Sequence, residues 1–313
     1  MLDKIKNFFS GNTSFGLQIT DTAIRIAQVS EKDGAFTLTK CAERKLELGI
    51  VVDGEILKEK ELSQQINSLF QEQKVDSKTC AVAIPEKQSF EHIFYIPSKI
   101  KGDEFAAYLD KLVAETIPLS FHSIKYDYSV VNLGQIQVVS VVAARREIIA
   151  QYYETLHQFS KIETLSLEPT YFSIMRNIAQ QFPKDQGTIL IDINEEKITW
   201  YAIWGANIFD MHTLDKADFN TNPSAINKEL EKVSQEFAKI TKLQITQIHL
   251  SGSPQNSAGL QKHLQKTIKL PISIIEKYKV EPPENGNHYK VAIGLALRGK
   301  GINNDSTINL LKK

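Results

Sequence analysis

Few residues of this sequence have the types and spacing that catalysis or metal binding requires. Asp192 lies at the end of an apolar run and could ligate Mg²⁺, but it could equally cap its own hairpin turn. Glu168 precedes Pro169 at a predicted helix start, where the helix dipole stabilises a carboxylate without any catalytic role. The seven histidines form no H-x-x-x-H pair, and no G-x-x-x-x-G-K-[ST], G-x-G-x-x-G or G-x-S-x-G motif occurs. The residues alone therefore carry no complete catalytic signature.

The composition excludes several classes of protein. The 313 residues include 37 Lys and Arg and 37 Asp and Glu, and this neutral balance argues against a general nucleic-acid binder. Hydrophobic residues make up 42% and charged residues 24%, which is typical of a globular chain of about two domains. No run approaches the ~20 apolar residues of a transmembrane helix, and Met1–Lys6 does not open a signal peptide. Cys41 and Cys80 are predicted to be reduced thiols, so we expect a cytoplasmic protein.

Two similar hairpins open the two halves of the chain. Strands are predicted at Phe15–Ile19 and Ile24–Val29, and again at Thr188–Ile193 and Ile198–Ile203, each pair around a polar turn. Strands alternate with amphipathic helices in both halves, which predicts an α/β protein. The segment 183–187 between the halves is predicted to be a linker. The position of each hairpin favours an internal duplication, although any two short hairpins look alike.

Two like halves that each open with a hairpin resemble the actin-like ATPase fold, in which the two hairpins face each other and hold phosphates. The finer pattern is similar to the PilM family, the actin-like proteins of type IV pilus assembly that are related to the cell-division protein FtsA. Five segments carry this resemblance: Phe15–Val29, Glu115–Leu119 with Tyr126–Tyr128, Leu165–Pro169, Ile248–Gly252 with Gly259 and Leu260, and Ala292–Arg298. Their order is that of the family, and the resemblance covers nearly the whole chain.

The resemblance implies an α/β, actin-like fold with duplicated ribonuclease-H-like halves, a small α+β subdomain inserted in the first half and a reduced lid in the second. The expected boundaries are 1–85 and 163–183 for the first subdomain, 86–162 for the insertion, 184–213 and 246–299 for the second subdomain, 214–245 for the lid and 300–313 for a tail. In the family the inserted subdomain helps to receive partners, so Phe90, Ile93 and Phe94 are the expected contact residues.

The first hairpin departs from the family pattern at the phosphate site. That pattern is Asp-x-Gly, because a carboxylate holds Mg²⁺ and a glycine lets backbone N–H groups approach the phosphate. Here Gln18 replaces the Asp and cannot supply its negative charge. Thr20 replaces the Gly, and its branched side chain makes a positive φ costly. Arg25 stands where the family usually has Lys.

The second hairpin and the purine-side loop are altered as well. Asp192 is kept, but Asn194 replaces the Gly, and Ser251 and Gly252 are followed by Ser253 in place of a second Gly. The short lid would leave the phosphates open to water. These residues are therefore doubtful nucleotide ligands. We expect no catalytic residue, no metal site and no cofactor, with ATP and Mg²⁺ bound weakly at most.

A short apolar segment near the end of the sequence resembles a partner peptide. Ile308, Asn309, Leu310 and Leu311 resemble the I-N-L-L-P signature at the cytoplasmic N-terminus of PilN, the membrane partner that the PilM family binds, with Lys312 in place of the Pro. The segment follows a polar linker, so we expect it to reach the PilN groove of its own molecule or of a neighbour. The alternative is a frayed apolar tail.

The expected function is that of a non-catalytic cytoplasmic scaffold in a type IV pilus, secretion or competence machine. It would bind the cytoplasmic peptide of a PilN-like inner-membrane protein and reach the inner face of the membrane only through that partner. Self-association is the one other protein contact that we consider. One alternative is a weak ATPase or ATP-gated switch. Another is an FtsA-like filament anchored to membranes by an N-terminal helix with Leu2, Ile5, Phe8 and Phe9 on one face.

Overall fold

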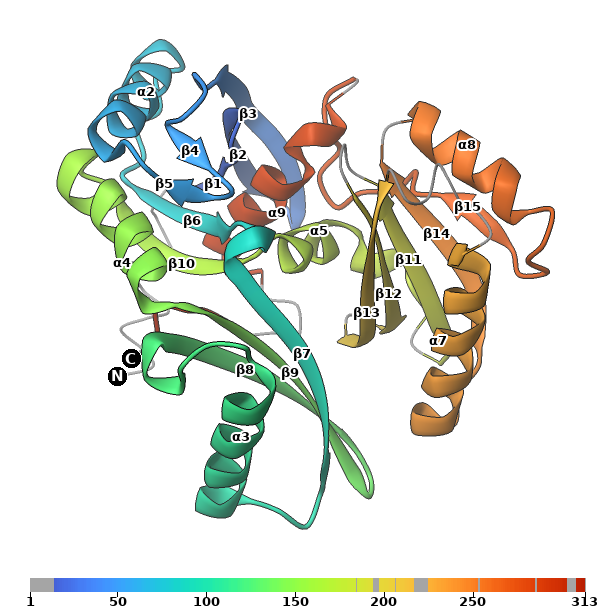
Figure 1. Cartoon of the computed structure of the whole chain (residues 1–313). Helices are drawn as coiled ribbons and strands as arrows, with labels where there is room; N and C mark the ends of the chain where they lie inside the picture. The colour runs from blue at the N-terminus through green and yellow to red at the C-terminus, as the bar shows by residue number, and fades with distance from the viewer. Residues whose placement is uncertain are drawn as a thin grey trace. The chain divides into compact units, whose positions relative to one another are not determined.

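The computed structural model describes residues 14–183, 185–193, 197–205, 207–216, 225–252, 254–284, 286–302 and 308–312 (Figure 1). The predicted N-terminal helix lies outside these residues. The chain forms two compact units: unit 1 comprises Met1–Asn177, Lys279–Pro282 and His288–Lys313, and unit 2 comprises Ile178–Tyr278 and Pro283–Asn287. Within the described residues, no helix is long and apolar enough to cross a membrane.

Unit 1 is built on a five-stranded sheet with the order β10-β6-β1-β2-β3. Strands β1 (Ser14–Ile19), β2 (Ala23–Lys32) and β3 (Ala35–Lys45) form an antiparallel meander, and β6 (Thr79–Ile84) and β10 (Glu163–Pro169) run parallel to β1. All of β6 is buried, as expected for a parallel strand that is covered on both faces. Strand β10 is at the edge of this sheet, so one side of its backbone has no strand partner within it.

Alternation along β1 places helices on both faces of the sheet. Phe15 contacts Phe70 of α2 (Glu59–Glu72) edge to face, with ring centroids 4.7 Å apart. Its neighbour Gly16 faces α9 (Lys290–Gly299), because successive residues of a strand point to opposite faces. The other elements around this sheet are β4 (Val51–Val52), β5 (Glu55–Ile56), α4 (Arg146–Glu154), the π-helical turn η3 (Thr155–Phe159) and α5 (Thr170–Ile178).

Unit 2 repeats the same topology in the order β13-β12-β11-β14-β15. Its meander consists of β11 (Gly187–Ile193), β12 (Lys197–Trp204) and β13 (Asn207–Asp215), and β14 (Ile245–Gly252) and β15 (Ile272–Ile274) run parallel to β11. The helical elements are η4 (Ala179–Gln181), α7 (Ala225–Thr241), α8 (Pro254–Leu264) and η5 (Asn287–Tyr289), which continues into unit 1. Strand order and direction agree between the units, so the predicted duplication is confirmed. Helix α7 lies in the segment predicted to be the reduced lid.

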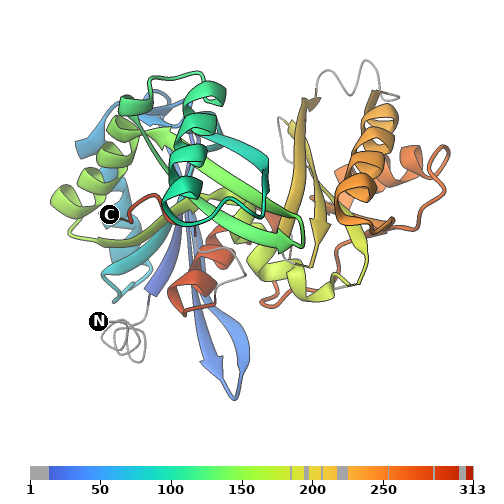
Figure 2. The same ribbon diagram turned by 90° about the horizontal axis from the view of Figure 1, so that it is seen from below.

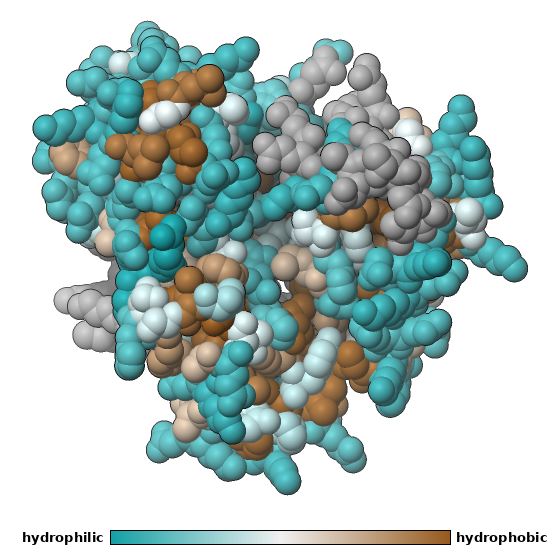
Figure 3. Space-filling model, in the orientation of Figure 1, coloured by the Kyte–Doolittle hydropathy of each residue, from teal (hydrophilic) through white to brown (hydrophobic). Residues whose placement is uncertain are grey.

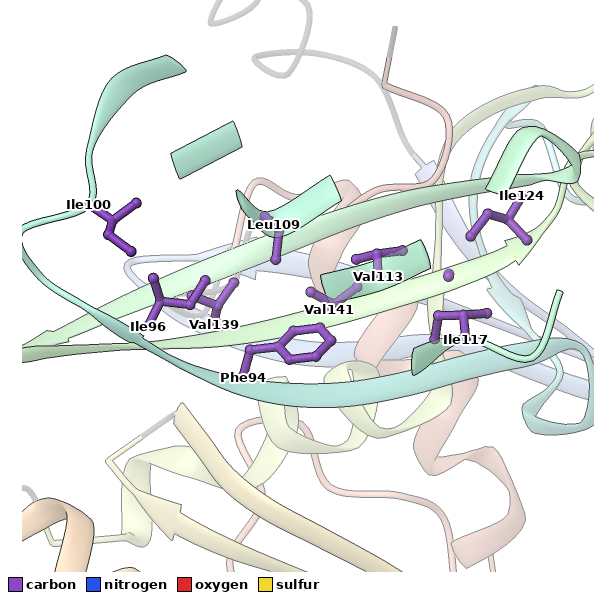
Figure 4. Close-up of a cluster of buried hydrophobic side chains, with 10 residues drawn as sticks. Phe94, Ile96, Ile100, Leu109, Val113, Ile117, Ile124, Val139 and Val141 are labelled. Atoms are coloured by element: carbon purple, nitrogen blue, oxygen red, sulfur yellow. The ribbon is translucent and has the colours of Figure 1, made fainter. Parts of the chain in front are cut away.

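The inserted subdomain is a three-stranded antiparallel sheet covered by one helix. The sheet has the order β7-β9-β8, with β7 (Ser89–Pro97), β8 (Ile124–Leu133), β9 (Ile136–Arg145) and the helix α3 (Gly102–Thr116). Short 3₁₀ turns, η1 (Glu86–Gln88) and η2 (Phe121–Ser123), precede β7 and β8. Figure 4 shows Phe94, Leu109, Val113 and Val141 gathered between the sheet and α3, where they form a buried core. This strand–helix–strand–strand order agrees with the sequence-based prediction for 86–162.

Helix α9 differs from its predicted place. The sequence-based boundaries put it in the second half, but it belongs to unit 1 and packs on β1. A Cβ atom on Gly16 would lie 1.9 Å from the carbonyl oxygen of Ala292, so a glycine is required at this crossing. A Cβ atom on Gly294 would lie 1.8 Å from the carbonyl oxygen of Ser173 in α5. Two glycines therefore let α9 pack tightly against both β1 and α5.

Large apolar side chains are exposed on unit 1 near the β4–β5 hairpin. Leu48 is 89% exposed, Leu57 56% and Val52 42%. Figure 3 shows apolar groups set among the hydrophilic surface of this unit. This patch belongs to elements other than β7, where the resemblance places the contact residues.

We predict that Gly16→Ala destabilises the protein by about 2–3 kcal/mol, because the added methyl group forces α9 away from β1. Urea denaturation of both proteins measures the change. Gly259→Ala in α8 is the matched control, since an added Cβ atom meets no atom within 4 Å there and alanine favours the helix. Equal stability of Gly16→Ala and the parent protein would contradict the proposed close packing.

Candidate functional site

The first hairpin uses its polar groups to close its own turn. The Thr20 N–H donates to the carbonyl oxygen of Ala23 over 2.9 Å. The Thr20 hydroxyl donates to the same oxygen over 3.0 Å and accepts from the Ala23 N–H over 3.1 Å. Thr20 has no positive φ, so the strain that its branched side chain would suffer there does not arise. The N–H groups of Thr20 and Ala23 are therefore used within the turn and are not free to bind a phosphate.

Asp21, at the tip of this hairpin, binds backbone rather than metal. Its carboxylate accepts from the N–H groups of Asp53 and Gly54, both over 2.8 Å. These two residues have φ values of 51° and 80°, and successive N–H groups in such a turn form a concave anion-binding site. The contact ties the first hairpin to the β4–β5 turn, and the sequence analysis did not identify it.

Gln18 and Arg25 lie opposite each other on β1 and β2. Arg25 donates from Nε to Glu43 on β3 over 2.6 Å. The Oε1 atom of Gln18 is buried and has no hydrogen-bond partner in the described structure. Among the described residues, no group of three His, Cys, Asp or Glu side chains is placed to hold a metal ion. Of the residues predicted to bind nucleotide in unit 1, Arg25 is held in an ion pair and Gln18 contributes an uncharged amide. Neither supplies a carboxylate for Mg²⁺.

The second hairpin keeps more of the expected arrangement. Asp192 is buried on β11, in register with Thr199 on β12 and Ser251 on β14. Gly252 has a φ of 157°, and a Cβ atom there would lie 2.8 Å from the carbonyl oxygen of Ile193. Ser251 and Gly252 thus lie beside Asp192 in unit 2, and a nucleotide-binding role for them stays a prediction. Asn194 lies outside the described residues.

Residues 308–312 are not a frayed tail, because they bind along the free edge of β10. The Leu310 N–H donates to the carbonyl oxygen of Leu167 over 2.9 Å. The Leu167 N–H donates to Oδ1 of Asn309 over 3.0 Å, and Nδ2 of Asn309 donates to the carbonyl oxygen of Leu165 over 3.1 Å. Alternate residues of a strand direct their backbone groups to the same side, so Leu165 and Leu167 both face the segment. The Asn309 amide thus takes the place of a strand backbone.

Asp127 of β8 closes the other side of this site. Its Oδ2 atom accepts from the Asn309 N–H and from Nζ of Lys312, each over 2.7 Å. Arg298 of α9 donates to the carbonyl oxygen of Ile308 over 3.3 Å. Ile308 is 1% exposed and Leu310 is fully buried, so these two of the segment's three apolar side chains are withdrawn from water, while Leu311 is partly exposed. Figure 2 shows this end of the chain, in red, beside the green strands of the inserted subdomain.

A buried ion pair lies next to this peptide site. Glu168 of β10 and Arg176 of α5 are 0% and 1% exposed and form a bidentate pair, with Oε1–Nη1 and Oε2–Nη2 distances of 2.6 and 3.0 Å. Arg298 also approaches Oε2 of Glu168, at 3.4 Å. Burial lowers the pKa of Arg298, and Glu168 opposes that shift. Arg176, more than the helix dipole expected from sequence, balances the charge of Glu168.

Three of the segments that carry the family resemblance meet at this site, which we call the β10 groove. Asp127 comes from Tyr126–Tyr128, the backbone contacts come from Leu165–Pro169, and Arg298 ends the segment Ala292–Arg298. The sequence analysis named these segments without assigning them a binding role. The only sequence signals were an isolated Asp in an apolar strand and an isolated Arg at the end of an apolar helix.

The predicted contact residues of β7 are not part of the β10 groove. Phe94 is only 7% exposed and belongs to the core between the three-stranded sheet and α3. Phe90 packs against the same core, while Ile93 is partly exposed. The prediction is corrected for Phe94, because the alternation of β7 turns its ring inward.

We predict that Arg176→Met destabilises the protein by about 3–5 kcal/mol, because it leaves the Glu168 carboxylate buried without its main partner. The double variant Glu168→Met/Arg176→Met should recover most of this loss, since it removes both charges and fills a similar volume. Urea denaturation of the three proteins tests the prediction. A double variant as unstable as the single variant would show that the charge balance is not the cause.

Comparisons with known proteins agree with this architecture. A family model described as type IV pilus assembly protein PilM matches residues 16–204. The structure of a PilM–PilN type IV pilus biogenesis complex has a TM-score of 0.70 at 20% identity, over 92% of this chain and 98% of that chain. The cytoplasmic domain of EpsL, an inner-membrane component of the type II secretion system of Vibrio cholerae, has a TM-score of 0.52 at 11% identity, over 96% of this chain and 99% of that chain.

No match is found among curated protein sequences. The predicted actin-like α/β fold is confirmed by the two matching sheets and by the structural neighbours. Because the family model covers more than half of the sequence, from the first hairpin to the end of β12, the chain belongs to the PilM family of type IV pilus assembly proteins.

Proposed function

We propose that this chain is a non-catalytic scaffold of a type IV pilus assembly machine and that it binds the cytoplasmic peptide of a PilN-like inner-membrane protein. Membership of the PilM family supports a role in type IV pilus assembly, and the likeness to a PilM–PilN complex supports a PilN-like binding partner. The scaffold would act in the cytoplasm and reach the membrane through that partner. The observation that carries the proposal is the β10 groove, in which residues 308–312 form a short turn and bond to the edge of β10.

The β10 groove has the properties of a peptide-binding site. An edge strand offers a row of backbone N–H and C=O groups, and an extended peptide gains affinity by pairing with them. Apolar side chains gain specificity by entering pockets, as Ile308 and Leu310 do here. Asp127 adds a charged acceptor at one side, and hydrogen bonds to a charged group are stronger than those between neutral groups. A partner peptide with the order apolar–Asn–apolar would meet the same groups.

The non-catalytic part of the proposal is supported by the hairpin contacts. Arg25 is paired with Glu43, and the polar groups of Thr20 are used within the turn. Gln18 supplies no charge for a divalent cation. Tight binding of a triphosphate needs charge neutralisation and free N–H donors at the hairpins. In the hairpin turn of unit 1 the one carboxylate, that of Asp21, is bonded to the β4–β5 turn, and the N–H groups of Thr20 and Ala23 are bonded within the hairpin.

A weak ATP-binding switch is the second candidate function. Asp192 is retained on β11, and Ser251 and Gly252 lie on the adjacent strand β14, which supports this second candidate. The filament hypothesis depends on Leu2–Phe9, which lie outside the described residues.

We predict that a fluorescein-labelled peptide with the sequence I-N-L-L-P binds this chain saturably and that the I-A-L-L-P peptide does not. The alanine peptide loses the amide that bonds to Leu165 and Leu167, so we expect its dissociation constant to be at least tenfold larger, about 1.4 kcal/mol, and its binding to be unsaturated at concentrations that saturate I-N-L-L-P. Fluorescence anisotropy measures both constants. Equal binding of the two peptides, or of neither, would contradict a sequence-specific site.

We predict no saturable binding of a fluorescent ATP analogue with Mg²⁺ up to millimolar concentration. The reason is that the first hairpin lacks both the carboxylate and the open turn that hold Mg²⁺ and phosphate. Asp192→Ala is the control, because it removes the retained carboxylate of the second hairpin. Micromolar binding that is lost in Asp192→Ala would replace the scaffold by the ATP-gated switch.

A further inference from the structure

We propose that the segment Ile308–Lys312 is a built-in competitor of the β10 groove, so that a partner peptide binds only after it has displaced this segment. The inference rests on the proposed function, because it concerns the regulation of the same groove. The starting observation is that the groove is already filled by residues of this chain, which use both the backbone of β10 and the carboxylate of Asp127.

The contacts of Asn309 make the segment a specific occupant. Its backbone N–H donates to Asp127, and its Nδ2 donates to the carbonyl oxygen of Leu165. Its Oδ1 accepts from the N–H groups of Leu167 and Leu311, each over 3.0 Å. Both ends of the amide are therefore bonded to β10, the donor to Leu165 and the acceptor to Leu167. Neither Asp nor Leu, which have almost the same size, offers both a donor and an acceptor.

Two peptides cannot use the groove at the same time. The Leu167 N–H is a single donor, and Oδ1 of Asn309 occupies it. The carbonyl oxygen of Leu167 accepts from Leu310, and the buried places of Ile308 and Leu310 are filled. A partner peptide that carries the same apolar–Asn–apolar order would need these groups. Binding of the partner and docking of the segment therefore exclude each other.

The segment can leave without unfolding unit 1. Strand β10 stays paired with β6 along its other edge, and Glu168 keeps its bidentate pair with Arg176. The charged contact between Lys312 and Asp127 is partly exposed, so water and salt weaken it. What holds the segment is a small set of hydrogen bonds and two buried side chains. Such a contact is suited to exchange with a peptide in solution.

Tethering sets the size of the effect. Five residues, 303–307, join the segment to the residues that follow α9. A short tether gives an effective concentration of the order of 1 mM. If the untethered segment would bind the groove with a dissociation constant below about 0.1 mM, the tethered segment raises the apparent dissociation constant of a competing peptide at least tenfold.

The test compares peptide binding by three full chains. The fluorescein-labelled I-N-L-L-P peptide is titrated against the parent chain, Asn309→Ala and the matched control Asn132→Ala, whose side chain is exposed on β8. Asn309→Ala should bind the peptide at least tenfold more tightly than the parent, because it weakens the competitor and leaves the groove intact. Asn132→Ala should bind like the parent. Hydrogen exchange should show that the Leu310 N–H is protected in the parent and exposed in Asn309→Ala.

Each outcome separates this inference from the proposed function. Equally tight binding to the parent and to Asn309→Ala would overturn the competitor and leave the peptide scaffold standing. If I-N-L-L-P binds neither chain, a second labelled peptide with the chain's own sequence, S-T-I-N-L-L-K, decides the question. If this peptide binds Asn309→Ala at least tenfold more tightly than the parent, the result supports the segment as a competitor and rejects I-N-L-L-P as the partner sequence. Equal binding to both chains would overturn the competitor hypothesis. If the parent chain binds the labelled peptide more weakly as the protein concentration rises, a second copy supplies the segment. That result also overturns the inference.

Discussion

The buried pair between Glu168 and Arg176 joins three elements on which unit 1 depends. Glu168 is on β10, Arg176 is on α5, and Arg176 also donates to the carbonyl oxygen of Gly294 in α9 over 2.9 Å. Burying two charges is favourable only when their geometry and hydrogen bonds are nearly complete. Here the bidentate contact, the Ser173 hydroxyl and the Gly294 carbonyl oxygen supply most of these bonds, and Nε of Arg176 is buried without a partner in the described structure. The pair therefore fixes the edge strand and the two helices to one another. Arg298 extends this network to the groove.

The β10 groove follows from that arrangement. Because β10 is an edge strand of a fixed sheet, the N–H and C=O groups of Leu165 and Leu167 hold their direction before any peptide arrives. The inserted subdomain contributes Asp127, and α9 contributes Arg298, so three separate parts of unit 1 contact one short peptide. A site of this kind does not need a large contact area, since little ordering remains to be done when the peptide binds. Access to it then depends on what already occupies the edge of β10.

The hairpin of unit 1 bonds most of its polar side chains to other parts of the same unit. Its strands pair as in unit 2, but Thr20 bonds across its own turn and Asp21 binds the β4–β5 turn. Arg25 is held by Glu43. The side chains of Thr20, Asp21 and Arg25 thus have partners within the protein, which stabilises the turn, while Oε1 of Gln18 has none in the described structure.

The periodicity of the sequence was sufficient to predict the strands, most of the helices and the duplication, because local spacing determines which face of an element is buried. Local pattern could not assign α9 to unit 1, because that assignment depends on the close approach of Gly16 to Ala292, two residues that are far apart in the sequence. It also misplaced Phe94, whose burial depends on α3. The resemblance identified the segment around Asn309 as a peptide. Its binding site came only from the tertiary structure, because β8, β10 and α9 are distant in sequence and meet only when unit 1 folds.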